Sequence, residues 1–178
     1  MSRVTVAQAE LRSAFRAAMA GVCTPVCVVT TVDRGRPHGT TVSAVASLSM
    51  SPPMVLVALD RGSGLLSLVR RTGSFGLNVL ASGQSDLALR FARKGEDRFT
   101  GTAWSAEPGS ARLAGIAAWV RCEVAELVGG GDHIIVLGSV VDAMSADAAP
   151  LTYHARTFGT HQRTEEGFAQ RRLNGEKR

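Results

Sequence analysis

Residues 38–53 read HGTTVSAVASLSMSPP, a stretch in which hydroxyl-bearing and apolar side chains alternate. Successive side chains of a β-strand point to opposite faces, so we expect the hydroxyls to share one face of a strand and the apolar side chains the other. The hydroxyl-bearing residues are Thr41, Ser43, Ser47, Ser49 and Ser51. Such a face is either a solvated strand surface or a row of donors that suits a flat polar ring and phosphate oxygens.

The segments on either side of this stretch are also typical of strands. A β-branched run at 26–32 leads into the turn Asp33-Arg34-Gly35, which predicts a β-hairpin of 26–32 with 36–49. The residues Ser51-Pro52-Pro53 interrupt the chain before the apolar run 54–59, whose length fits a fully buried strand. We therefore expect a β core.

Helices and further strands are expected along the rest of the chain. A capping box of Thr5 and Gln8 begins an amphipathic helix that ends at Gly21. The other expected helices lie at 64–71 and 84–92, and the other strands at 75–80, 116–128 and 133–144, the last two joined by the glycine-rich turn 129–132. At least six short strands joined by hairpins indicate a mainly β, antiparallel fold with peripheral helices, and they argue against a parallel βαβ sheet.

The composition fits one globular domain. The chain has 178 residues, of which 45% are hydrophobic, and a mean hydropathy of +0.09, with no run long enough to predict a membrane span. We expect a domain at 1–159, a polar tail at 160–178 and a cytoplasmic location. The net charge of +5 comes from arginine, since Lys94 and Lys177 are the only lysines. This bias is typical of a GC-rich genome, so we expect no nucleic-acid partner.

The three cysteines do not form a metal-binding or disulfide pattern. Cys23, Cys27 and Cys122 have no CxxC spacing and no histidine at ligand spacing, so we expect neither a zinc site nor a disulfide scaffold. Cys27 and Cys122 lie in apolar runs, where a thiol usually acts as a small core side chain.

Several motifs together resemble the short-chain flavin reductase family, the small reductase components of two-component flavin-dependent monooxygenases. Each motif alone is weak, but they follow one another in the family's order over most of the chain. The motifs are FRAAM at 15–19, VVTT at 28–31, the block 39–53, FGLNVL at 75–80, DRF at 97–99, GDH at 131–133, GSV at 138–140 and PLTYH at 150–154.

This resemblance implies a flavin reductase-like split β-barrel with antiparallel Greek-key strands. It also implies a homodimer that binds FAD or FMN near the subunit interface, oxidises NADH or NADPH, and releases reduced flavin to a partner monooxygenase. In this family the cofactors carry the chemistry, which is consistent with a sequence that has no catalytic triad, carboxylate pair, metal site or GxGxxG fingerprint. The sequence leaves open which flavin, which nicotinamide nucleotide and which monooxygenase are used.

The resemblance further implies where the flavin binds. The ring and ribityl chain would lie against 41–45, with the phosphate near the loop 60–63 and the stretch 90–94, where guanidinium and ammonium groups suit an anion. The implied flavin-binding residues are Thr41, Val42, Ser43, Ala44, Val45, Ser47, Ser49, Asp60, Arg61, Gly62, Ser63, Arg90, Phe91, Ala92, Lys94 and Phe158. An exposed, charged helix end is the alternative interpretation of Arg90 and Lys94.

His133 is the histidine that the resemblance favours for function, as the residue that positions the nicotinamide. A turn histidine bonded within its own hairpin is the alternative. His38 is a secondary candidate, His154 is expected to be structural, and His161 is expected to belong to the tail.

The sequence departs from the family pattern at three positions. Pro25 replaces a more usual glycine and removes a backbone donor, Ala44 stands where a second serine is frequent, and Phe158 replaces a tyrosine, so that it can stack on a ring but donates no hydrogen bond. Two other functions stay open. One is a split-barrel oxidoreductase that holds its flavin tightly and reduces another substrate, and the other is a non-enzymatic flavin- or haem-binding module.

Overall fold

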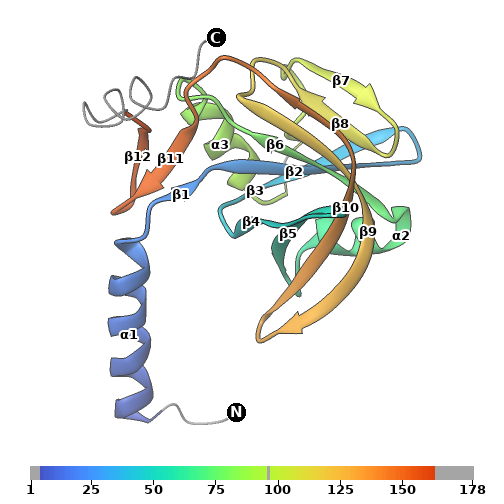
Figure 1. Cartoon of the computed structure of the whole chain (residues 1–178). Coiled ribbons are helices and arrows are strands. Elements are labelled where there is room, and N and C mark those ends of the chain that lie inside the picture. Colours follow the sequence, from blue (N-terminus) through green and yellow to red (C-terminus); the bar gives the residue numbers. More distant parts are fainter. Residues whose placement is uncertain (1–4, 96, 163–178) are drawn as a thin grey trace.

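The computed structural model describes residues 5–95 and 97–162, and within them the chain forms three helices and twelve strands (Figure 1). The helices are α1 (Val6–Ala20), α2 (Gly64–Thr72) and α3 (Ser85–Ala92). The strands are β1 (Thr24–Pro25), β2 (Cys27–Asp33), β3 (Arg36–Val42), β4 (Val45–Met50), β5 (Pro53–Asp60), β6 (Ser74–Val79), β7 (Trp104–Glu107), β8 (Ser110–Leu113), β9 (Ala118–Gly130), β10 (His133–Ser145), β11 (Leu151–His154) and β12 (Thr157–Thr160).

Seven strands form one antiparallel sheet in the order β3-β2-β6-β9-β10-β5-β4. The strands β3 and β4 lie at its two edges, yet only Ser43 and Ala44 separate them in the chain. A sheet whose two edges are joined so closely must curl on itself, which makes it a barrel that is split between β3 and β4. The predicted mainly β, antiparallel split barrel is therefore confirmed.

Two hydrophobic clusters pack on opposite faces of this sheet. Cys27 and Val29 lie in the cluster that packs against α2, whereas Val26 and Val28 lie in the cluster that contains Phe91 of α3. The strand β2 is therefore buried on both faces, which explains why its sequence is a continuous β-branched run and not an alternating one. Cys27 and Cys122 are both core residues, as the sequence predicted.

The prediction of one long strand at 36–49 was wrong. The chain bends at Ser43 and Ala44, because β3 pairs with β2 while β4 pairs with β5 on the other edge of the barrel. The amide of Ala58 donates to Ala44 O at 2.9 Å and fixes this bend. A register shift between Ser47 and Ser49 interrupts β4 as well, so the predicted hydroxyls do not form one continuous row.

The sequence also missed several short strands. No strand was expected between 92 and 116, where β7 and β8 form a small hairpin, and the three-stranded sheet β1-β11-β12 was not expected either. The strand β12 includes Thr160, the first residue of the predicted tail, and residues 163–178 of that tail lie outside the described part.

The helix α1 begins with the predicted capping box and stands away from the barrel (Figure 1). None of its side chains is buried, and Leu11 and Phe15 are 70% and 63% exposed. The apolar face of α1 therefore has no partner among the described residues of this chain. In the described part, no helix is long and apolar enough to cross a membrane.

Candidate functional site

A pocket of about 1380 Å³ follows the free edge of β3. Every residue from Arg36 to Ala44 lines it. The first turn of α2 forms one wall, at Gly64 and Leu65, and the loop that follows α3 forms the other, at Lys94, Gly95 and 97–100. Because β3 is an edge strand, its outward backbone groups remain available to a bound molecule.

The helix α3 holds β3 in place from behind. The hydroxyl of Thr41 donates to Ala88 O at 2.6 Å. At Gly39, an added Cβ would lie only 2.9 Å from Cε1 of Phe91, so this close contact of strand and helix requires glycine. The edge that faces the pocket is therefore rigidly supported.

One end of the pocket is formed where the end of β5 lies beside the start of β10. His133 at the start of β10 lies opposite Asp60 at the end of β5, and both line the pocket with Ser43 and Ala44. Arg61 ties this end together, since its amide donates to Asp132 O at 3.0 Å and its Nε donates to Gly131 O at 2.8 Å. The turn before β10 and the loop after β5 thus form a single fixed rim.

The side chain of His133 is oriented by its neighbour in the chain. Its Nδ1 lies 2.7 Å from Oδ1 of Asp132. The hydrogen bond from His133 lowers the pKa of the Asp132 carboxyl below its usual value, so this group is ionised at neutral pH. With Nδ1 engaged, Nε2 is the ring nitrogen that remains for a ligand.

Basic groups lie along the middle and the other end of the pocket, contributed by Arg36, His38, Lys94 and Arg98. Arg98 joins the two walls, because its Nη1 donates to Gly39 O of β3 at 2.5 Å and its Nη2 donates to Arg93 O after α3. Asp97 is held in the loop by Phe99, whose amide donates to its carboxylate at 2.9 Å, and by the Thr100 hydroxyl, which lowers the Asp97 pKa. These groups make the middle of the pocket favourable for phosphate.

The structure brings most of the predicted site residues into this one pocket. Those that line it are Thr41, Val42, Ser43, Ala44, Asp60, Gly62, Ser63, Ala92, Lys94 and His133, together with the secondary candidate His38. Residues so distant in the sequence converge because β3, β5 and β10 meet at the split of the barrel.

Seven predicted residues lie elsewhere. Val45, Ser47 and Ser49 are on β4, beyond the bend, and Arg61 supports the rim from outside the lining. Arg90 donates to Thr100 O and Thr102 Oγ1, while Phe91 is fully buried behind β3. Phe158 packs against Tyr153 in the three-stranded sheet, with ring centroids 5.3 Å apart.

Sequence reasoning did not assign a site role to Arg36, Arg98 or Trp104, all of which line the pocket. Arg98 belongs to the DRF motif at 97–99, so a signal was present in the sequence without a chemical role attached to it. Arg36 and Trp104 carried no local signal, since only the fold places both of them in the lining of one pocket.

The residues present fit a phosphorylated nucleotide with a flat ring. The free strand edge offers backbone donors and acceptors, Ser43 adds a hydroxyl group, and Leu65 and Leu68 give an apolar wall. The cations at Lys94 and Arg98 suit a phosphate group. The fold thus places a ring site and an anion site in the same pocket.

Comparison with known proteins agrees with this geometry. Residues 19–162 match the flavin reductase like domain family. The chain is 38% identical over 143 residues to a flavin reductase of Pseudomonas putida, covering 78% of this chain and 84% of that protein. It is also 38% identical over 152 residues to the flavin reductase (NADH) of Kitasatospora aureofaciens, covering 81% and 78%.

Solved structures show the same architecture. The NADH:FAD oxidoreductase of Streptomyces globisporus C-1027, in complex with NAD and FAD fragments, superposes with a TM-score of 0.80 at 27% identity, covering 93% of this chain and 99% of that one. Component B of nitrilotriacetate monooxygenase from Mycobacterium thermoresistibile gives a TM-score of 0.83 at 29% identity, covering 87% and 89%. The family match spans far more than half of the sequence, and the resemblance seen in the motifs is confirmed: this chain belongs to the flavin reductase like domain family.

Proposed function

We propose that this protein is an NAD(P)H:flavin oxidoreductase that transfers hydride from a reduced nicotinamide to FAD or FMN and releases the reduced flavin for a partner monooxygenase. The observation that carries this proposal is the single pocket along β3, which has His133 at one end and a cluster of cations beyond it. The relatives named flavin reductase support the same activity.

The chain's own residues provide position and charge in this proposal. When the two nucleotides are bound, they supply the redox chemistry, as hydride leaves C4 of the nicotinamide and joins N5 of the flavin. The free edge of β3 and the hydroxyl of Ser43 hold the flavin, and Lys94 holds its phosphate. His133, oriented by Asp132, positions the nicotinamide over the flavin ring, where the reacting atoms must approach to about 3–3.5 Å.

The decisive experiment follows the loss of NADH and NADPH absorbance with FMN and with FAD over a range of flavin concentrations. We expect the rate of NADH or NADPH oxidation to saturate as the flavin concentration rises. We also expect each enzyme molecule to reduce many flavin molecules, which would identify flavin as a substrate. A protein that keeps a flavin through a desalting column and does not reduce added flavin would contradict the proposal and favour a tightly bound cofactor.

We also propose that the enzyme is a homodimer. Leu11, Phe15 and Met19 are all exposed on one face of α1, and none of the residues at 5–95 and 97–162 covers that face. An isolated helix of 15 residues is only marginally stable in water, so α1 needs a partner surface to remain folded. A second copy of the chain provides such a surface.

A cytoplasmic location is part of the same proposal. All three cysteines are free thiols, which is usual for proteins of a reducing compartment. The partner monooxygenase receives the reduced flavin by diffusion, so no stable complex with it is required.

A further inference from the structure

The end of the pocket farthest from His133 is formed by the start of β3. The seven residues of β3 span about 20 Å at roughly 3.3 Å per residue. Ser43 and His133 lie beyond one end of this strand and Arg36 lies at the other. The pocket therefore extends well past the residues that would hold a flavin ring.

Two positions along this length carry positive charge. Arg98 is bonded to Gly39, at the middle of β3, and Lys94 lies in the same loop. Arg36 lies three residues farther along the strand, about 10 Å away at the same spacing. In the described part of the chain, the side chains of Lys94 and Arg36 have no hydrogen-bond or ion-pair partner, so both are available to a ligand.

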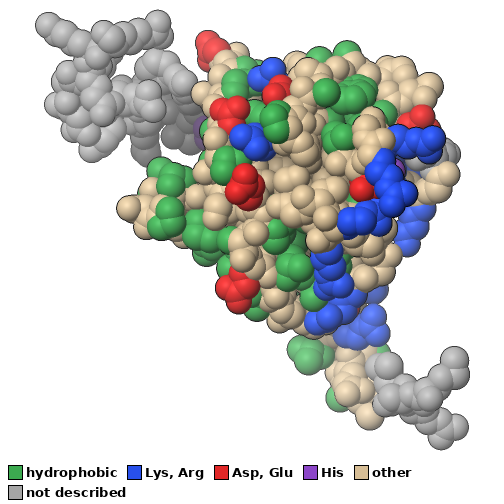
Figure 2. Space-filling view, turned by 90° about the vertical axis from the view of Figure 1, so that its right-hand side faces the viewer, with side chains coloured by type: hydrophobic (Ala, Val, Ile, Leu, Met, Phe, Trp, Pro, Cys, Tyr) green, Lys and Arg blue, Asp and Glu red, His purple; other side chains and the backbone are tan. Residues whose placement is uncertain are grey.

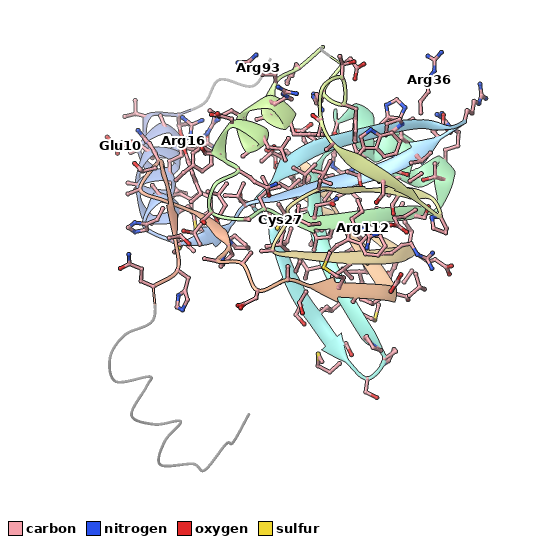
Figure 3. The ribbon with its side chains drawn as sticks, turned by 90° about the horizontal axis from the view of Figure 1, so that it is seen from above. Glu10, Arg16, Cys27, Arg36, Arg93 and Arg112 are labelled. Carbon is pink, nitrogen blue, oxygen red and sulfur yellow. The ribbon has the colours of Figure 1, made fainter. Side chains whose placement is uncertain are left out.

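The charges around Arg36 do not neutralise this end of the pocket. Asp33, at the end of β2, is bound by Arg71 through Nη2 at 2.7 Å, and that hydrogen bond lowers its pKa. Figure 2 looks onto α2 and the β2–β3 turn and shows Lys and Arg side chains gathered along one side of this face. Figure 3 shows Arg36 and Arg93 on the same side of the barrel, one near the hairpin turn and one after α3.

An aromatic ring also lines this pocket. Trp104 lines the pocket and is half-buried, and Phe99 holds it edge to face with ring centroids 5.6 Å apart. An indole supported in this way can stack a purine base, an interaction that tolerates any base because every base has a π face.

From this arrangement we propose that the Arg36 end is a subsite for the adenosine half of FAD, so that this chain prefers FAD to FMN. The proposal rests on the proposed function. The phosphate that FMN and FAD share lies at Lys94 and Arg98. The second phosphate and the adenosine, which only FAD has, extend along β3 to Arg36 and Trp104.

The subsite belongs to the flavin and not to the nicotinamide nucleotide, because of where His133 lies. If His133 positions the nicotinamide, that nucleotide enters at the end of the pocket formed by β5 and β10. The flavin ring lies against Thr41 and Ser43, on the strand that continues to Arg36, so the flavin's own chain follows the free edge of β3.

The test measures equilibrium binding of oxidised riboflavin, FMN and FAD by the change in flavin fluorescence, without turnover. For the unaltered protein we expect a Kd for FAD about tenfold below that for FMN. We expect Arg36→Gln to raise the Kd for FAD about five- to tenfold and to leave FMN and riboflavin unchanged. Lys94→Gln should weaken FMN and FAD together but not riboflavin.

The matched control is Arg70→Gln, which removes the same charge from the exposed end of α2, outside the pocket, and should change no Kd. Equal Kd values for FMN and FAD in the unaltered protein would overturn the proposal. So would an Arg36→Gln variant that weakens NADH and not FAD. A protein that binds FAD more tightly than FMN but reduces neither would contradict the proposed activity while leaving the subsite in place.

Discussion

The Nδ1 atom of His133 lies 2.7 Å from Oδ1 of Asp132, the residue immediately before it. Asp132 is almost fully exposed, whereas the imidazole is partly covered and lines the pocket. The carboxylate thus holds Nδ1 from the solvent side, so that Nε2 is the ring nitrogen left for a ligand. Two adjacent residues in a turn can therefore orient a ring without a buried charge.

This pair predicts a selective effect on the nicotinamide nucleotide. His133→Ala should raise KM for NADH about tenfold, while Asp132→Asn should raise it about threefold, because the hydrogen bond is exposed and weak. Neither variant should change the Kd of oxidised flavin, which is measured separately. A rise in flavin Kd that equals the rise in KM for NADH would mean that His133 contacts the flavin instead.

Asn78 is the centre of a buried polar network that holds the β7–β8 hairpin on the barrel. Its Nδ2 donates to Val28 O and Ala111 O, each at 3.2 Å, and its Oδ1 accepts from the Leu113 amide at 2.8 Å. Asn78→Ala should lower the free energy of unfolding by about 2–4 kcal/mol, since it leaves buried backbone groups unpaired. Urea denaturation measures this loss.

Asn78→Asp separates hydrogen bonding from volume. The substituted side chain has nearly the same size but replaces the donor with an acceptor that faces two carbonyl oxygens and carries a buried charge. We expect it to destabilise the protein at least as much as Asn78→Ala. If Asn78→Asp had no effect, the contribution of this network to stability would be refuted.

Local sequence signals predicted the elements that form by local rules. The capping box at Thr5, the strand at 54–59 and the hairpin turn at 129–132 each depend on neighbouring residues, and all three are present. The strand is not fully buried as predicted, because only its alternate residues Val55, Val57 and Leu59 are buried. The β7–β8 hairpin was missed because long-range bonds to Asn78 and Thr30 hold it. Similarly, nothing near residue 98 in the sequence reveals that Arg98 bonds to Gly39, 59 residues away.

Gly138 offers a test of core packing between β10 and β6. An added Cβ would lie 2.5 Å from Cζ of Phe75 and 2.9 Å from Cβ of Cys122. Gly138→Ala should therefore cost about 1–3 kcal/mol of unfolding free energy through overpacking. Gly83→Ala is the control, because no atom lies within 4 Å of its added Cβ. Equal stability of the two variants would show that the β6–β10 contact can relax.

The cysteines should differ sharply in reactivity. Burial raises the pKa of both Cys27 and Cys122 to about 12, while Cys23 is exposed. A thiol-specific reagent should modify one cysteine in the native protein and all three in denaturant. Rapid labelling of more than one thiol in the native protein would contradict the observed burial.

The buried thiols also predict loss of stability in alkali. Their folded pKa values exceed the ordinary value of 9.0, so the unfolded chain releases protons that the folded chain retains. The contribution of the two protonated thiols to the free energy of unfolding is fully present below about pH 9. It is lost as the pH rises toward 12, because ionised thiols are unfavourable in the core. Replacing Cys27 with alanine should make the decline above pH 9 less steep, although it lowers stability at neutral pH by removing core volume.

The exposed face of α1 predicts the oligomeric state. Leu11 and Phe15 lie on one face of the helix, and Ser13 lies on the opposite face. If a second chain covers the apolar face, Phe15→Glu should convert the dimer to a monomer, because it places a charge in an apolar interface. Ser13→Glu adds the same charge to the other face and should leave the dimer intact. Size-exclusion chromatography with light scattering distinguishes these outcomes. An unaltered protein that is monomeric at all concentrations, or dimerisation that survives Phe15→Glu, would rule out this interface.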